Sequence, residues 1–215
     1  MKFLILDSQI NFFEENGFIE FENVFPKEKI QILENEVDTI FKSKKNLNFF
    51  EQYIAFRDLF RKSSIIKKIV LDKNLASIVK ALSNKSSLRV IFDQTFLTNK
   101  KNLFESSTTI NDLISFQGAI CFLLIKLDNN IALNSNTFPK NPGSLVFFKS
   151  SISIDNPQIY LKDLYSNSQK FLLIGYGDIK TVYKLNKKDP NLNYLKKYGY
   201  SFGDTLKDEF HPIVS

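Results

Sequence analysis

The residue types best suited to metal binding or nucleophilic chemistry are scarce in this chain. Its 215 residues include one histidine, His211, and one cysteine, Cys121. One histidine excludes every site that needs two imidazoles from the same chain, and one cysteine excludes an intramolecular disulfide and any multi-cysteine metal site. His211 precedes Pro212 near the end of the sequence, where a surface or packing role is expected. Cys121 lies in a strongly apolar run, where a buried thiol is inert.

Three polar side chains interrupt segments that are otherwise apolar and strand-forming. Asp93 and Gln94 follow the apolar residues 90–92, and Gln117 follows Phe116. Because successive side chains of a strand point to opposite faces, each of the three can face solvent or the mouth of a barrel. Both interpretations stay open, and the three residues are candidates for lining a pocket.

Two further patterns carry little chemistry. Gly175-Tyr176-Gly177 is only the start of a glycine-rich phosphate loop, because the third glycine and a following helix are missing. Lysine pairs recur along the chain, whose net charge is +6, but acidic residues lie between them. This pattern predicts a solvated surface, with a weak basic patch for nucleic acid or an acidic partner as the alternative.

The elements that must position these residues change in type along the chain. Helices are expected from Asp7 or Ser8 to Gly17 and from 27 to 41, and two or three short ones between 53 and 82. Strands are expected at 18–24, 88–97, 115–127, 144–148 and 171–176, and a short late helix from Asp189 to Gly199. Residues 120–125 are almost continuously apolar, as in a strand buried on both faces. Segregated helices and strands indicate an α+β fold whose sheet forms a sandwich or barrel.

Length and composition favour one domain. Hydrophobic residues make up 43% of the chain and charged residues 24%, which is enough apolar material for a sizeable core. We expect residues 1–85 to be a mainly helical flank, 86–178 the core and 179–215 a C-terminal extension. No apolar run approaches the roughly 18 residues of a membrane span or forms the core of a signal peptide. A cytoplasmic location without a membrane partner is therefore expected.

The order of several short motifs resembles the phytanoyl-CoA dioxygenase family. Residues 9–18 and 21–25 match a helix, a Gly-Phe stop, a strand and a second helix that opens after Asn-Val. Residues 88–94 resemble the family's first core strand, and 142–148 resemble the Pro-Gly-x-hydrophobic-Phe-Phe step before the distal metal ligand. The resemblance implies a double-stranded β-helix, a cupin-like antiparallel jelly roll, with N-terminal helices packed on the outside. It also implies hydroxylation that depends on iron(II) and 2-oxoglutarate.

The chain departs from the family where the metal would bind. The family holds iron with a His-x-Asp/Glu pair and a distant His, and this chain contains no His-x-Asp/Glu. The stretch 106–115 offers only Asp112 as a carboxylate, and no histidine follows Phe148 at the distal position. The family's basic residue that grips the far carboxylate of 2-oxoglutarate has a candidate counterpart in Lys170, which lacks the bidentate fork of arginine.

These observations predict an iron-free, non-catalytic relative that acts as a binding or regulatory protein. No catalytic residue, metal or cofactor is expected. The candidate pocket consists of Asp93, Gln94, Gln117 and Lys170. Its occupant would be a small anionic or apolar ligand, or the partner would be a protein, and nucleic acid is not expected. One alternative is a dioxygenase-like enzyme with altered, carboxylate-only metal ligands, and the other is a weak nucleic-acid or acidic-partner binding protein.

Overall fold

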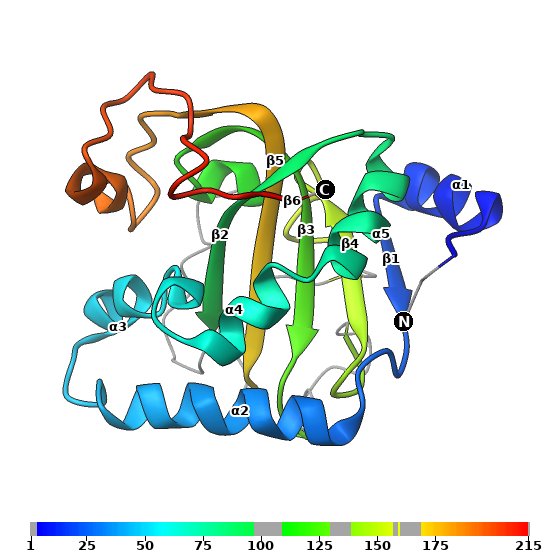
Figure 1. Ribbon diagram of the computed structural model, residues 1–215, viewed down its shortest axis with the longest axis horizontal. Helices are drawn as coiled ribbons and strands as arrows, with labels where there is room; N and C mark the ends of the chain where they lie inside the picture. Colours follow the sequence, from blue (N-terminus) through cyan, green and yellow to red (C-terminus); the bar gives the residue numbers. More distant parts are fainter. Residues whose placement is uncertain (1–3, 97–108, 130–138, 157–158, 160–168, 215) are drawn as a thin grey trace.

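The computed structural model describes residues 4–96, 109–129, 139–156, 159 and 169–214 (Figure 1). The helices are α1 (Asp7–Asn16), α2 (Lys27–Lys42), α3 (Phe49–Ala55), α4 (Ser64–Val70) and α5 (Lys73–Ser83), with short 3-10 helices η1 (Leu59–Arg61), η2 (Ile110–Leu113) and η4 (Tyr194–Tyr198). The strands are β1 (Phe18–Phe21), β2 (Leu88–Phe96), β3 (Phe116–Lys126), β4 (Leu145–Lys149), β5 (Phe171–Tyr183) and β6 (Ile213–Val214).

Local sequence explains where the N-terminal helices begin and end. α1 ends at Gly17, which adopts a left-handed φ of 77° and donates its N–H to the Phe13 carbonyl. α5 begins after Asp72, whose carboxylate accepts the backbone N–H groups of Asn74 and Leu75. Of the helices within the described residues, none is both long and apolar enough to cross a bilayer.

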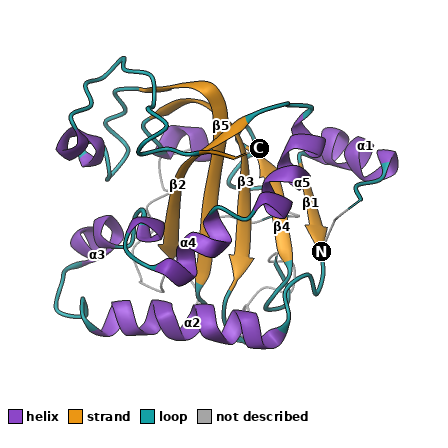
Figure 2. Ribbon diagram, viewed as in Figure 1, coloured by secondary structure: helices purple, strands orange, loops and turns teal. Residues whose placement is uncertain are grey.

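The six described strands form one antiparallel sheet in the order β1-β4-β3-β5-β2-β6 (Figure 2). The first and last strands of the chain lie at its two edges, and β6 pairs Val214 with Leu88 and Ile213 with Arg89. At the centre, β3 is fully buried from Cys121 to Lys126, as expected for a strand covered on both faces. The antiparallel pairing and the segregated helices confirm the α+β fold class.

Each face of the sheet has its own apolar cluster. On the helix face, strand residues such as Leu123 and Ile174 pack against apolar residues of α2, α4 and α5. Figure 1 shows α4 and α5 in front of the sheet and α2 running across the ends of its strands. On the opposite face, here called the inner face, Phe92, Phe122 and Phe148 pack with η2, with residues that follow β4 and with the C-terminal segment. N-terminal helices therefore cover the outside of the sheet, as predicted.

The helix α3 begins at Phe49, earlier than the expected start near Tyr53. Its cap explains the difference, because the Asn48 side chain accepts the Glu51 N–H and the Glu51 carboxylate accepts the Asn48 N–H. This reciprocal pair lies in a polar stretch without apolar periodicity, so hydrophobic patterning does not predict this start.

The C-terminal region also differs from expectation. β5 continues to Tyr183, past the predicted core boundary at 178. The late helix begins at Tyr194 instead of Asp189, because the Asp189 carboxylate accepts the N–H groups of Ser115 and Asn191 and so fixes a turn first. The predicted strand end at Leu97 lies outside the described residues.

Candidate functional site

The four predicted pocket residues lie in separate places. Gln117 is exposed and pairs with Val182 at one end of β3, whereas Lys170 immediately precedes β5 at the other end. Asp93 and Gln94 are both buried in β2, but as neighbours along a strand they face opposite sides of the sheet. The structure therefore brings no two of these side chains together in one pocket.

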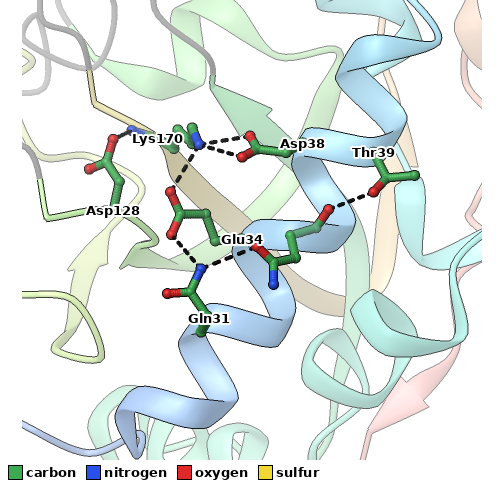
Figure 3. A network of polar contacts seen from close by, with 7 residues as sticks. Gln31, Glu34, Asp38, Thr39, Asp128 and Lys170 are labelled. Carbon is green, nitrogen blue, oxygen red and sulfur yellow. Dashed lines mark hydrogen bonds and ion pairs between the residues drawn. The ribbon is translucent and has the colours of Figure 1, made fainter.

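Lys170 is held by the protein's own carboxylates (Figure 3). Its Nζ lies 2.9 Å from Glu34 Oε1 and 2.7 Å from Asp38 Oδ1, one turn apart on α2, and its backbone N–H donates to Asp128 Oδ2 at 2.9 Å. Burial lowers the pKa of Lys170, but the hydrogen bonds and charges of Asp38 and Glu34 outweigh it, so the pKa is raised. This corrects the expectation that the ammonium opens into a pocket. A pair of helical carboxylates within reach neutralises it, and Lys170 ties α2 to the start of β5.

Replacing Lys170 with Met should lower the free energy of unfolding by about 1 kcal/mol, since the three side chains are partly exposed and solvent screens the pair. The loss should shrink in high salt, where the ion pairs contribute less. Urea unfolding at low and high salt measures both effects. Lys67→Met, on the exposed side of α4, is the matched control and should change neither value. Equal stability of wild type and Lys170→Met would show that the ion pairs contribute nothing.

Asp93 caps a 3-10 helix on the helix face. Its Oδ2 accepts the N–H of Leu59 at 3.1 Å and its Oδ1 accepts the N–H of Phe60 at 2.9 Å. Asp58, which precedes η1 with a left-handed φ of 53°, pairs with Arg61 Nε at 3.1 Å. Burial, followed by the nearby Asp58 carboxylate, raises the pKa of Asp93 to about 7. Asp93 thus anchors η1 to β2 and is not a free pocket acid.

Gln94 faces the inner side of the sheet. Its Nε2 donates to the carbonyls of Tyr53 at 3.1 Å and Thr95 at 3.2 Å, which fixes the orientation of the amide. Its Oε1 is buried and has no hydrogen-bond partner among the described residues. A buried acceptor left unpaired costs roughly 1–3 kcal/mol, so this oxygen is a candidate contact for a ligand.

Arg57 joins Gln94 on the inner face, and sequence reasoning missed it. The two backbones form an isolated antiparallel bridge. The guanidinium is buried and lies 3.4 Å from the centroid of the Phe92 ring and 5.7 Å from that of Phe116. Among the described residues, no hydrogen bond or ion pair holds this guanidinium, and the carboxyls of Asp58 and Asp93 interact with it only through space. The sequence feature that could have drawn attention to Arg57 is the rarity of its residue type, since the chain has only three arginines among 29 basic residues.

His211 is a buried packing residue. Its Nδ1 lies 3.1 Å from the Ile91 carbonyl oxygen, and its ring meets Phe116 and Tyr200 edge-on. Burial, then the positive charge of the three arginines, lowers the pKa of His211 to about 3, so the imidazole is neutral at pH 7. Its Nε2 has no hydrogen-bond partner among the described residues.

The donor set does not fit the iron site of the family that the sequence resembles. Within the described residues no group of three His, Cys, Asp or Glu side chains could hold a metal ion. Asp112, the carboxylate in the expected ligand stretch, accepts the N–H and hydroxyl of Thr109 and so caps η2. Residues 106–108 of that stretch lie outside the described residues.

Comparison with known proteins gives the fold. No family model matches the chain, and no curated protein matches it. Similar solved structures include the non-heme α-ketoglutarate-dependent carbocyclase SnoK from nogalamycin biosynthesis, with a TM-score of 0.68 and 12% identity over 98% of this chain and 97% of that one. EctD from S. alaskensis with bound Fe has a TM-score of 0.54 and 12% identity, over 81% and 77%. CT296 from Chlamydia trachomatis has 0.53 and 16%, over 83% and 99%.

At these identities the likeness shows the fold alone. The chain has the α+β double-stranded β-helix fold of the iron- and 2-oxoglutarate-dependent oxygenases, with its N-terminal helices on the outside.

Proposed function

We propose that this protein is a non-catalytic, phytanoyl-CoA dioxygenase-like relative of the 2-oxoglutarate oxygenases, which binds a ligand or protein partner without iron. The observation that carries this proposal is the role of His211. It is the chain's one imidazole, and it is buried between aromatic rings with Nδ1 directed at a main-chain carbonyl. A two-histidine, one-carboxylate site therefore cannot be assembled from one chain.

The charge around His211 supports the same proposal. Arg61, Arg89 and Arg57 all act on this imidazole electrostatically. Positive charge that disfavours the imidazolium also disfavours a divalent cation at the unpaired Nε2. The surroundings of the imidazole thus favour a neutral or anionic neighbour over iron(II).

Anaerobic titration with iron(II) and 2-oxoglutarate tests the proposal. We expect no stoichiometric iron in equilibrium dialysis, no metal-to-cosubstrate absorption band, and succinate formation no higher than that of iron alone in buffer. The His211→Asn variant is the matched control and should take up as little iron as the wild type, because His211 is expected to bind none.

Two outcomes would contradict the proposal. Stoichiometric iron with succinate formation above the metal-only background would make the protein an enzyme with altered ligands. Stoichiometric iron that disappears in His211→Asn would show that the buried imidazole is a ligand after all.

A further inference from the structure

The three arginines of this chain gather around one part of the sheet, but only two of them are paired. Arg61 Nε lies 3.1 Å from Asp58 Oδ2, and Arg89 Nη2 lies 3.0 Å from Asp208 Oδ1. Arg57 is the exception among the described residues. It is 3% exposed, and within the described part of the chain its guanidinium makes no hydrogen bond or ion pair, although its charge acts through space on the carboxyls of Asp58 and Asp93. A buried guanidinium in this state lacks the hydrogen bonds that buried charges normally make.

The position of the Arg57 guanidinium relative to the Phe92 ring shows from which direction a ligand could reach its N–H groups. One of its faces is covered by the Phe92 ring at 3.4 Å, so the planar fork lies flat on that ring. The N–H groups of a guanidinium point outward in its own plane, where a carboxylate can accept two of them side by side. Stacking on Phe92 thus holds the fork in one orientation, and the N–H groups along its edge have no acceptor among the described residues.

A second unpaired group lies beside the first. The backbone bridge between Arg57 and Gln94 places both side chains on the inner face. Gln94 presents Oε1 without a partner, because its Nε2 is already committed to two carbonyls. Two half-buried tyrosines border the pair. The Tyr53 carbonyl accepts from Gln94, and the Tyr194 hydroxyl donates to the Arg57 carbonyl at 3.3 Å. The site therefore lies close to the surface at the edge of the sheet.

We propose that Arg57 and Gln94 form a binding site for a small hydroxy carboxylate. The ligand's carboxylate takes the guanidinium fork, and its hydroxyl donates to Gln94 Oε1. This inference deepens the proposed function, on which it rests, by naming the ligand class. An amine in place of the hydroxyl would carry positive charge toward the arginines, so a hydroxyl suits the site better. 2-Oxoglutarate has carboxylates but no donor for Gln94, so it satisfies only half of the site.

Matched pairs of acids test the site on the wild-type protein, without any mutation. Isothermal titration with malate against succinate, and with lactate against propionate, isolates the hydroxyl. We expect each hydroxy acid to bind roughly tenfold more tightly than its deoxy partner, and malate to bind more tightly than 2-oxoglutarate. Equal binding within both pairs, or no binding of any of these acids, would overturn the proposal.

Two variants test the residues. Arg57→Lys keeps the charge but removes the fork, and should weaken malate binding about 10- to 100-fold. Arg61→Lys is the matched control, because Arg61 is paired with Asp58, and should bind malate as the wild type does. Far-UV circular dichroism checks that both variants fold. Unchanged binding by a folded Arg57→Lys would overturn the assignment.

The iron titration and the malate titration test two different proposals. Iron uptake in the iron titration would reject the proposed function, whereas failure of malate to bind an iron-free protein rejects this site alone.

Discussion

The His211→Asn variant should lose the part of the acid sensitivity that arises from the buried imidazole. In the folded protein the pKa of His211 is lowered to about 3, whereas an unfolded histidine titrates near its ordinary value of 6.5. Between these values the unfolded chain binds a proton that the folded chain does not. Stability from His211 is therefore complete above pH 6.5 and is lost as the pH falls toward 3. The full loss is up to ~5 kcal/mol.

Asparagine is the informative replacement because its amide can still donate to the Ile91 carbonyl but does not titrate. The cavity left beside Phe116 lowers stability at every pH, so the slope with pH is the measurement rather than the value at one pH. Urea unfolding followed by tyrosine fluorescence suits a chain with eight tyrosines and no tryptophan. A variant that keeps the wild-type slope between about pH 6.5 and 4 would show that the imidazole is protonated in the folded state.

The Asp93→Asn variant should lose the fall in stability with rising pH that the buried Asp93 carboxyl causes. The folded pKa of Asp93 is raised to about 7, while the unfolded carboxyl titrates near its ordinary 3.8. Between these values the folded state holds a proton that the unfolded state has released. The contribution of Asp93 is therefore complete below about pH 4 and is lost as the pH rises through 7. Asparagine leaves one of the two N–H groups of Leu59 and Phe60 without an acceptor, which lowers stability by about 1–3 kcal/mol at every pH. Between about pH 4.5 and 8 the variant should nevertheless gain up to ~3 kcal/mol relative to the wild type.

Asp189→Asn provides the matched control for Asp93→Asn. Asp189 is also buried and also accepts two backbone N–H groups, from Ser115 and Asn191. Its replacement should destabilise the protein at alkaline pH, because one N–H loses its acceptor. If the difference in stability between Asp93→Asn and the wild type did not change between about pH 4.5 and 8, the folded Asp93 carboxyl would not hold its proton in that range.

The two contributions have opposite signs between about pH 4 and 6.5, so they offset each other in the wild type. His211→Asn should then expose a fall in stability with rising pH, and Asp93→Asn should expose a rise. The double variant should return to the slope of the wild type. A cycle of four proteins therefore separates two buried groups that one pH profile of the wild type would hide.

Elements defined by local patterns could be predicted from the sequence. The apolar periodicity of α2, the Gly17 stop of α1 and the apolar run of β3 each depend on neighbouring residues, and each appears where expected. The α+β class followed from their order. The late helix starts five residues after its expected start because the Asp189 carboxylate is used by Ser115, a residue distant in sequence.

The site could not be predicted in the same way, because its contacts are not local. Lys170 meets Glu34 across 136 positions of sequence, so its position before an apolar strand says nothing of its partners. Arg57 lies in a short segment between helices, where a charged residue is expected in solvent. The Arg57 guanidinium is buried on the Phe92 ring because its backbone forms a bridge with Gln94, and this bridge exists only in the folded sheet.

The pairing of β6 with β2 has a consequence for how the protein is made. Leu88 pairs with Val214 and Arg89 with Ile213, and the Val90 N–H donates to the Pro212 carbonyl. These three residues of β2 can therefore pair only after the C-terminal segment has been synthesised. While the ribosome is still adding the residues between β2 and β6, the backbone N–H and C=O groups on this side of β2 remain unpaired, as on an exposed edge strand. Such an edge is a template for the same C-terminal strand of another copy, so slow synthesis or crowded nascent chains should favour strand-exchanged dimers joined through β6.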